Sequence, residues 1–401
     1  MSEGKPVTIL CLASYYKGTA FLLKAKELGC HVILVAKETL SEEAWPDESI
    51  DERFFMPDLT RRPDIIHAVS YLARGRQIDR IVPLDDYDVE TAASLREHLR
   101  LPGIGETLVR HFRDKLAMRM QASRAGIAVP AFVPIINYDR IREFMDRVPP
   151  PWVLKPRSEA GAMGIKKIHD SEQLWRRLDQ LGDEQSFFLL EQYIPGDVCH
   201  VDGIVSEKEV VFAVAHRYGA PPMNVAHEGG VFVTRTLPPE SDEAQEMFAL
   251  NKRLMKALGM VRGANHTEFI RGQDGILYFL ETAARVGGAN IDRAVEAATG
   301  INLWEEWARI EVAHARGERY ELPPALADYA GLLVCLAQQE WPDLAQFDDP
   351  EVVWRLRKKQ HAGVIVVSED PERIKRLLDN YTTRFVHNFL AVAPPLDKPP
   401  A

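Results

Sequence analysis

The stretch ANHTEFIRGQDGILYFLETAARVGGANI, residues 264–291, has the pattern of two β-strands joined by a tight turn. Asp274 and Gly275 favour a two-residue type I′ turn, in which both central residues have positive φ. If these two residues form the loop, the strand pairing places Glu268 directly opposite Glu281, with Cβ atoms about 4.5–5.5 Å apart. A loop two residues longer would shift this register but keep both side chains on one face.

Two like charges placed opposite each other destabilise a sheet unless something neutralises them. A divalent cation would do so. Oxygen ligands from the protein, with positions left for phosphate oxygens, describe Mg²⁺, for which Mn²⁺ could substitute. The alternative interpretation is that Glu268 and Glu281 are exposed on a solvated strand face.

The residues that follow this hairpin extend the hypothesis. Arg285 lies on the same face as Glu281 by alternation, and Gly287 and Gly288 leave backbone N–H groups open to an anion. Metal carboxylates, an arginine and an accessible backbone suit a phosphorylated or carboxylate substrate. The alternative is a surface arginine before a Gly-Gly turn.

The first hundred residues alternate between strand and helix patterns, which predicts parallel βαβ units. Asp85, Asp86 and Asp88 follow the last of these strands, where they could orient an amine or cap the next helix, and capping is the favoured interpretation. Strands are expected at 7–13, 31–36 and 78–83, and helices at 18–29 and 64–75.

The sequence between 131 and 218 is strand-rich with two helices, which predicts antiparallel α+β structure. The stretch 99–106 contains Pro and two Gly and indicates a boundary, followed by one helix over 107–125. A small α+β subdomain closes the chain, with a disordered tail at 393–401. We therefore predict domains at 1–106, 107–194, 195–311 and 312–401.

Composition bounds the class of protein. The 401 residues are too many for one ordinary core, and 46% hydrophobic with 27% charged residues is typical of a folded protein. A net charge of −10 argues against non-specific binding to nucleic acid or an anionic membrane. No signal peptide, membrane span or CxxC pair is evident among these residues, which favours the reducing cytoplasm. GxxxxGK[ST], GxGxxG, HExxH and GxSxG are absent from the sequence.

Over residues 1–310 the sequence resembles the ATP-grasp superfamily, specifically its carboxylate–amine ligases. The motifs are RDKLAMRMQASRAGIAVP (113–130), WVLKPRSEAGAMGI (152–165), FLLEQYIPGDVCHVDGIV (188–205), and TEFI with FLETAARVGG in the hairpin. The resemblance implies ATP-binding lysines at Lys115 and Lys155, a flexible phosphate loop with Gly161 and Gly164, adenine contacts at Glu191, Tyr193 and Ile194, a ribose-binding acid at Asp197, and Mg²⁺ ligands at Glu268 and Glu281.

The sequence around Lys155 supports the ATP-binding role that the resemblance implies, whereas the sequence around Lys115 alone does not. Lys155 lies inside an apolar strand, where an unpaired charge is costly. Lys115 alone would more readily be interpreted as a solvated helix residue. His227, in a Gly-rich loop, could contact substrate or be an ordinary loop histidine.

One position departs from the family pattern. The family usually has Glu-x-Asn, with the Asn on a second Mg²⁺, whereas this chain has Ala283. The predicted register pairs Ala283 with His266, and our hypothesis is that His266, a water or the substrate fills the place. Histidine is a poor Mg²⁺ ligand, so a hydrogen-bonding role is favoured.

The predicted fold is α/β plus α+β: a Rossmann-like N-terminal domain, then an ATP-grasp lid, a central domain and a small C-terminal subdomain. The resemblance implies ATP-dependent amide formation through an acyl phosphate, with Arg285 and Lys155 as catalytic residues and small-molecule carboxylate and amine substrates, most simply amino acids. The alternatives are a carboxylating or purine-pathway relative and a catalytically silent nucleotide-binding module. A homodimer is expected only by analogy.

Overall fold

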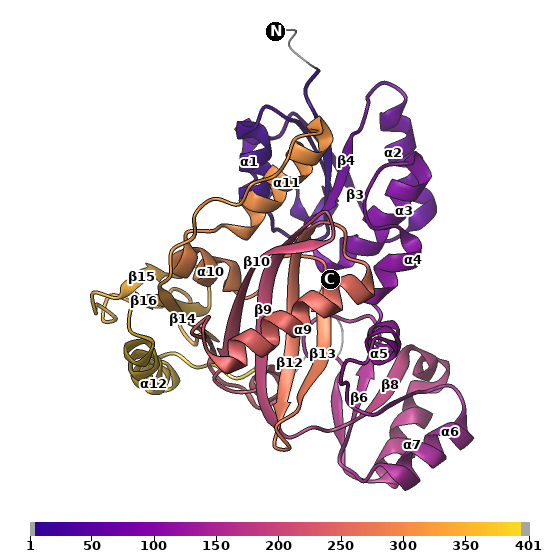
Figure 1. Cartoon of the computed structure of the whole chain (residues 1–401), viewed down its shortest axis with the longest axis vertical. Helices are drawn as coiled ribbons and strands as arrows, with labels where there is room; N and C mark the ends of the chain where they lie inside the picture. Colours follow the sequence, from indigo (N-terminus) through magenta and orange to yellow (C-terminus); the bar gives the residue numbers. More distant parts are fainter. Residues whose placement is uncertain (1–4, 394–401) are drawn as a thin grey trace.

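The computed structural model describes residues 5–393, which form three β-sheets with helices packed on them (Figure 1). The first four residues, and the tail beyond Ala393 for which disorder was expected, lie outside the described residues. None of the helices formed by residues 5–393 is long and apolar enough to cross a bilayer.

The N-terminal sheet is parallel, in the order β3-β2-β1-β4. The βαβ prediction is therefore confirmed, but β3 at the edge was missed because its residues are only half-buried and lack a continuous apolar run. The elements are β1 (Thr8–Ala13), α1 (Thr19–Glu27), β2 (His31–Lys37), β3 (Glu52–Met56), α2 (Arg62–Ala73), β4 (Arg80–Pro83) and α3 (Val89–Leu99).

The helix predicted over 107–125 is broken into two. Asp114 separates the parts, because its side chain accepts the N–H of Leu116 over 3.0 Å and so caps the second helix. The segment consists of α4 (Glu106–Val109), a 3₁₀ turn (Arg110–Phe112) and α5 (Lys115–Arg124). This cap places Lys115 at the start of α5 instead of on a helix flank.

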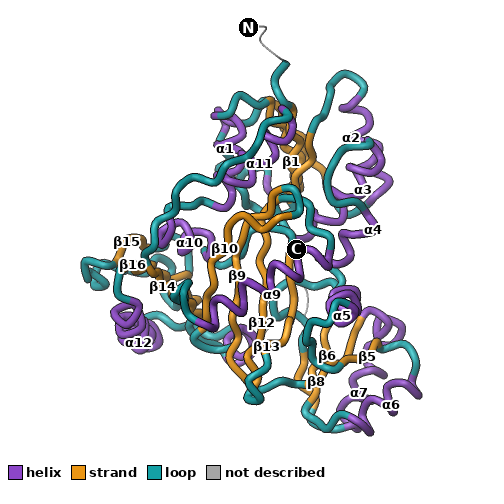
Figure 2. The backbone as a smooth tube through the Cα atoms, viewed as in Figure 1, coloured by secondary structure: helices purple, strands orange, loops and turns teal. Residues whose placement is uncertain are grey.

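The second sheet is a small antiparallel unit in the order β5-β8-β6-β7, visible as a separate lobe in Figure 2. Its two helices bury Phe144 and Leu174 against the strands, and the result matches the predicted α+β lid. The elements are β5 (Phe132–Pro134), α6 (Tyr138–Arg147), β6 (Trp152–Pro156), β7 (Lys166–Ile168), α7 (Ser171–Leu181) and β8 (Phe188–Gln192).

The central sheet is the largest, with the order β13-β12-β9-β10-β11-β14-β16-β15. It includes the C-terminal strands, so the predicted C-terminal subdomain continues the central sheet and does not form a sheet of its own. The boundaries at 106, 194 and 311 remain predictions. The strands are β9 (Gly196–Ser206), β10 (Glu209–Tyr218), β11 (Phe232–Thr236), β12 (Gly263–Gly272), β13 (Leu277–Ala283), β14 (Tyr329–Leu336), β15 (Val352–Arg355) and β16 (His361–Ser368).

Helices cover both faces of the central sheet. One face packs on α9 and α5 through residues such as Leu254 and Met118, and Figure 1 shows α9 crossing the strands. On the other face, Trp307 of α11 lies edge-on to Phe21 of α1, with ring centroids 5.9 Å apart, which joins the central sheet to the N-terminal domain. The remaining helices are α8 (Pro222–Glu228), α9 (Asp242–Leu258), α10 (Ile291–Thr299), α11 (Leu303–Arg316) and α12 (Pro371–Asn388).

Candidate active site

The hairpin of β12 and β13 carries the two glutamates in the predicted arrangement. Glu268 pairs with Glu281, and His266 pairs with Ala283. Both glutamates line a cavity between the lid sheet and the central sheet. The two acidic side chains therefore meet at the place where these two sheets approach each other.

The turn of this hairpin differs from the predicted type I′ geometry. Gly275 has a positive φ of 80°, whereas Asp274 does not. Gly272 donates its N–H to the carbonyl of Ile276 over 2.9 Å, so the loop has three residues. The strand register next to the loop is therefore shifted by one residue from the predicted register. A bulge at Leu280 cancels this displacement before the strands reach the glutamates. The predicted pairing is confirmed, although the predicted turn is wrong.

Glu268 is held by one group on its own strand, β12, and by one on β10, two strands away. The hydroxyl of Tyr218 donates to Oε1 of Glu268 over 2.8 Å, and Nε2 of His266 lies 3.6 Å from the same oxygen. Burial alone would raise the pKa of Glu268, but His266 and Tyr218 hold it below its usual value. The carboxylate is therefore kept ionised inside the protein, as a metal ligand must be.

Lys115 is buried and joins the hairpin to the lid. Its Nζ lies 3.0 Å from Oε2 of Glu281 and donates to the carbonyl of Glu159 over 2.6 Å. Its backbone N–H donates to the carbonyl of Arg157 over 2.8 Å. With an exposed fraction of 4%, Lys115 is not the solvated helix residue of the alternative interpretation.

Lys155 and Glu191 form a buried ionic cluster with Arg119, a residue that sequence reasoning missed. Nζ of Lys155 lies 2.5 Å from Oε2 of Glu191, and Nε of Arg119 lies 2.6 Å from Oε1. Burial lowers the pKa of Lys155, with Glu191 opposing the shift. Burial would raise the pKa of Glu191, but the two cations hold it below its usual value. Both carboxylate oxygens are engaged, which leaves adenine contacts to the neighbouring backbone.

Most of the residues expected to contact ATP border the cavity that the two glutamates line. Asp197 does not: it is exposed, whereas Gly196 and Val198 on either side line the cavity, because successive strand residues face opposite ways. The expected residues on this cavity are Lys155, Gly161, Glu191, Tyr193, Ile194, Glu268 and Glu281.

The glycine loop lines this cavity through Gly161 and Ala162, and His227 lies against that loop. Gly161 and Gly164 have φ of 65° and 67°, a conformation that side chains other than glycine rarely adopt. His227 belongs to the short helix α8, not to the predicted loop, and its Nε2 lies 3.4 Å from the carbonyl of Ala162. The structure thus brings His227 onto the glycine loop.

Arg285 lies in a second, smaller cavity beside the first. Lys115, His266, Glu281 and Asp86 also line it. Nε of Arg285 lies 3.8 Å from Oδ1 of Asp86, and Nη1 donates to the carbonyl of Val286 over 2.8 Å. Burial would raise the pKa of Asp86, but Arg113 and Arg285 keep it below its usual value. The cavity therefore brings basic and acidic side chains together.

Gly287 packs closely against His266, the histidine that pairs with Ala283. A Cβ at Gly287 would lie 2.7 Å from Oδ1 of Asp202 and 3.1 Å from Nδ1 of His266, so only glycine fits. A Cβ at Gly288 would meet nothing within 4 Å. The two glycines therefore differ: Gly287 is required by packing, and Gly288 borders open space.

The other aspartates after β4 have structural roles. Asp85 accepts the N–H of Tyr87 over 3.1 Å, so it caps the 3₁₀ turn Asp86–Asp88, and it also pairs with Lys17. Helix α3 itself has no side-chain cap, so the capping interpretation holds for the turn before this helix and not for the helix. Asp88 accepts the N–H and hydroxyl of Ser14 over 2.8 and 2.6 Å. Burial nevertheless dominates at Asp88 and raises its pKa to about 7.

This raised pKa predicts a pH dependence that Asp88→Asn removes. The folded state keeps the proton to a higher pH than the unfolded state, so the contribution of Asp88 to stability is complete below about pH 4 and is lost as the pH rises to 7. Relative to Asp88→Asn, the wild type should lose up to about 1.4 kcal/mol per pH unit in this window. Urea unfolding of both proteins at pH 5, 6 and 7 measures the difference. Parallel pH curves would contradict the prediction.

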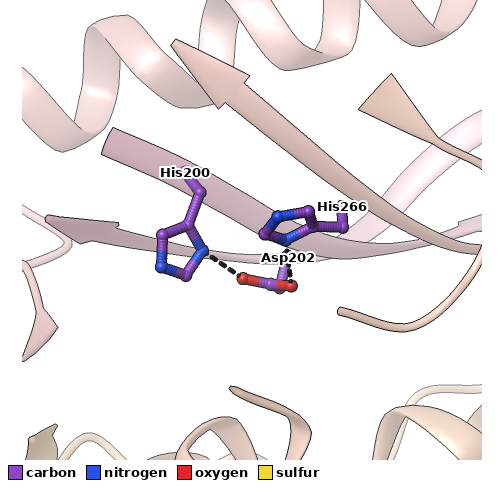
Figure 3. Close-up of side chains that lie close together, drawn as sticks. All are labelled: His200, Asp202 and His266. Carbon is purple, nitrogen blue, oxygen red and sulfur yellow. Dashed lines mark hydrogen bonds and ion pairs between the residues drawn. The ribbon is translucent and has the colours of Figure 1, made fainter. Parts of the chain in front are cut away.

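Sequence reasoning also missed His200 and Asp202, which lie behind Glu268. Figure 3 shows the two histidines, His200 and His266, on either side of the Asp202 carboxylate. Burial would lower the pKa of His266, but Asp202 and Glu268 raise it to about 10. The available signal was the alternation His-x-Asp in CHVDG, which places His200 and Asp202 on one strand face.

Two family models match this chain. The model described as the ATP-grasp N-terminal domain matches residues 22–103, and the model described as the ATP-grasp domain matches residues 148–292. Together the matches span more than half of the chain. The chain belongs to the ATP-grasp superfamily.

Named relatives of this ATP-grasp protein include amino-acid ligases. It is 27% identical over 269 residues to the L-arginine-specific L-amino acid ligase of Bacillus subtilis, covering 65% of this chain and 64% of that protein. It is 34% identical over 113 residues to the D-alanine–D-alanine ligase of Nitrosomonas europaea, covering 28% and 36%. The chain thus spans less than two thirds of the length of these curated relatives.

Solved structures confirm the fold of this ATP-grasp protein along nearly the whole chain. The L-amino acid ligase from Bacillus licheniformis matches with a TM-score of 0.76 at 17% identity, covering 96% of this chain and 99% of that one. The N5-carboxyaminoimidazole ribonucleotide synthetase from Thermus thermophilus matches with a TM-score of 0.71 at 18% identity, covering 98% and 99%.

Proposed function

We propose that this protein is an ATP-dependent carboxylate–amine ligase that joins two amino acids or similar small molecules into an amide. The observation that carries the proposal is the pairing of Glu268 with Glu281 beside buried Lys115, on the cavity between the lid and central sheets. The names of the sequence relatives, which include L-amino acid and D-alanine–D-alanine ligases, support this choice of reaction.

The two glutamates fit a divalent cation. They offer carboxylate oxygens from adjacent strands, Glu268 is kept ionised, and a bound ion would relieve their mutual repulsion. When bound, Mg²⁺ or Mn²⁺ would offset the negative charge of the phosphate groups of ATP. Ala283 supplies no further side-chain ligand. His266 lies opposite it and lines the Arg285 cavity, which fits a hydrogen-bonding role there.

The remaining residues have complementary roles in the proposed reaction. The substrate carboxylate attacks the γ-phosphorus of ATP, so that an acyl phosphate forms and ADP leaves. The substrate amine then attacks the acyl carbon, loses a proton, and expels phosphate as the amide forms. Lys115 and Lys155 compensate phosphate charge, and Arg285 stabilises the acyl phosphate and the oxyanion of its tetrahedral adduct. The glycine loop at Gly161 and helix α8 would exclude water from the intermediate.

The nucleotide would lie along the larger cavity. The backbone of Tyr193 and Ile194 borders its apolar end, where Val198 and Leu280 would contact adenine. A ribose contact from Asp197 is not favoured by its exposed position, so we leave it out of the proposed site. Gly287 and Gly288 would contribute backbone N–H groups to the substrate.

The proposed enzyme would work in the cytoplasm, because its four cysteines are all free and buried, as suits a reducing compartment. A homodimer remains an analogy with the superfamily.

A panel of amino acids tests the proposal. Purified protein is incubated with ATP, Mg²⁺ and single or paired amino acids, and released phosphate and product mass are measured. We expect phosphate release that depends on amino acids, and a product with the summed mass of two substrates less one water. Bicarbonate-dependent release would favour a carboxylating relative, and tight ATP binding without release would favour a silent nucleotide-binding module. Either result would overturn the ligase proposal.

A further inference from the structure

A group of buried polar side chains, three of which are drawn in Figure 3, lies on the same face of the central sheet as Glu268. Nδ1 of His200 lies 2.6 Å from Oδ2 of Asp202, and Nδ1 of His266 lies 2.9 Å from Oδ1. His200 and Asp202 are on β9, and their strand partners on β12 are Glu268 and His266. The strand register therefore places the four side chains in a compact square on one face.

The contacts to Glu268 all involve one of its two carboxylate oxygens. His266 approaches Oε1 of Glu268 from β12, and Tyr218 donates to the same Oε1 from β10. Neither contact involves Oε2. The carboxylate is thus held at one oxygen, and the other is left to the cavity that Glu268 lines.

The histidines and Asp202 could instead be interpreted as a metal centre of their own, since their ligand atoms lie within 4.8 Å of one another. The hydrogen bonds favour a network. Each oxygen of Asp202 already accepts from one imidazole, and Nε2 of His200 lies 2.8 Å from the hydroxyl of Thr234. The ring nitrogens of His200 are therefore both within hydrogen-bond distance of protein oxygens, which leaves neither of them free for an ion.

The network also fixes the orientation of His266. Because Nδ1 donates to Asp202, the ring must present Nε2 towards Glu268. Gly287 packs against both Asp202 and His266 and leaves no room for the ring to rotate towards it. The position of His266, and through it that of Glu268, depends on Asp202, a residue of β9 that does not itself line the cavity.

We propose that Asp202 is a positioning residue which, through His266, holds Oε1 of Glu268 so that Oε2 is presented to a divalent cation. The inference rests on the proposed function, in which Glu268 binds that cation. Tyr218 holds the same oxygen from the other side and has the same role by a separate route. Groups that orient metal ligands in this way typically change metal affinity about 10–100-fold when they are removed.

The test is the affinity of the protein for Mn²⁺ in the presence of ADP, measured from the electron paramagnetic resonance signal of free Mn²⁺. Asp202→Asn and Tyr218→Phe are each expected to raise the Kd for Mn²⁺ by about 10–100-fold. Binding of ADP without metal should change less than about twofold in both variants, because neither side chain lines the cavity. In turnover, the KM for Mg²⁺ should rise while kcat at saturating Mg²⁺ largely recovers.

Thr267→Val is the matched control. Thr267 is buried on the opposite face of the same hairpin, where its hydroxyl lies 2.7 Å from that of Thr282. Its replacement disturbs the hairpin without touching the network, so Mn²⁺ affinity should stay within about twofold of the wild type. Weakening equal to that of Asp202→Asn would show general damage and overturn the proposal.

Glu268→Gln separates this inference from the function on which it rests. Failure of the wild type to bind Mn²⁺, or undiminished binding by Glu268→Gln, would refute the proposed metal site itself. Loss of binding in Glu268→Gln with wild-type affinity in both Asp202→Asn and Tyr218→Phe would refute only the positioning role. Tyr218→Phe decides the question if Asp202→Asn does not fold.

Discussion

Glu268→Gln is expected to lower amino-acid-dependent phosphate release by about 10²–10³-fold, the loss that follows when several kcal/mol of charge stabilisation are removed. The amide keeps the size of the side chain but removes its charge, so the pair with Glu281 can no longer attract a divalent cation. Glu281→Gln should have a similar effect, and it should also leave Lys115 without its carboxylate partner. Initial rates of phosphate release at saturating ATP measure the loss.

The control for this prediction is Glu246→Gln. Glu246 is a glutamate of α9 that pairs with Arg271 on the same strand as Glu268, but it lies away from the cavity. Its replacement should leave phosphate release unchanged. If Glu268→Gln retained more than half of the wild-type rate, the assignment of the hairpin as the metal site would be wrong.

Glu191→Gln is expected to destabilise the lid by about 3–5 kcal/mol, because it leaves Arg119 and Lys155 buried without their shared counter-charge. Arg119 is fully buried and Glu191 is 1% exposed, so solvent cannot compensate either cation. The effect is large because one carboxylate serves two cations. Amide hydrogen exchange in β6 and β8, the strands that carry Lys155 and Glu191, reports the local opening of the lid.

Glu172→Gln provides the comparison within the same lid. Glu172 pairs with Arg176 one turn along α7, and both are well exposed, so its loss should cost less than about 0.5 kcal/mol. Comparable acceleration of exchange in the two variants would contradict the buried-cluster explanation. Exchange in the N-terminal sheet should not change in either variant, since that sheet contains no part of the cluster.

The pairing of the glutamates could be predicted from sequence because side-chain alternation constrains a hairpin strongly. The turn could not, since Asp-Gly fits both a two-residue loop and a three-residue loop with glycine at positive φ. The bulge at Leu280 that restored the pairing has no evident signal in the sequence. The predicted pairing of the glutamates is therefore correct only because the three-residue loop and the bulge at Leu280 offset each other, and the prediction contained neither feature.

The buried partners were harder to anticipate than the site itself. Arg119 lies on α5 in sequence that has the pattern of an ordinary charged helix, and only the tertiary structure brings it to Glu191. Asp202 and His266 are separated by 64 residues and meet only because β9 pairs with β12. Strand pairing between distant segments is the step that a single sequence does not specify.

Elements with long, continuous apolar runs were easier to predict from the sequence. The strands β1, β2 and β4 were predicted within about two residues of their observed bounds. The break before Lys115 was missed because the helical pattern continues across Asp114, whose capping role is decided by one hydrogen bond. Lys115 owes its place in the site to that break.

The pairing of β11 with β14 has a consequence for shortened forms of this protein. The segment from 312 onward supplies three strands to the sheet that carries the glutamates, and α12 seals their outer side. A chain ending at 311 would expose the N–H and C=O groups of β11 at the edge of the sheet, where another chain could pair with them. Fragments trimmed to the matched family regions should accordingly aggregate, so the C-terminal strands protect the edge of the sheet that carries the two glutamates.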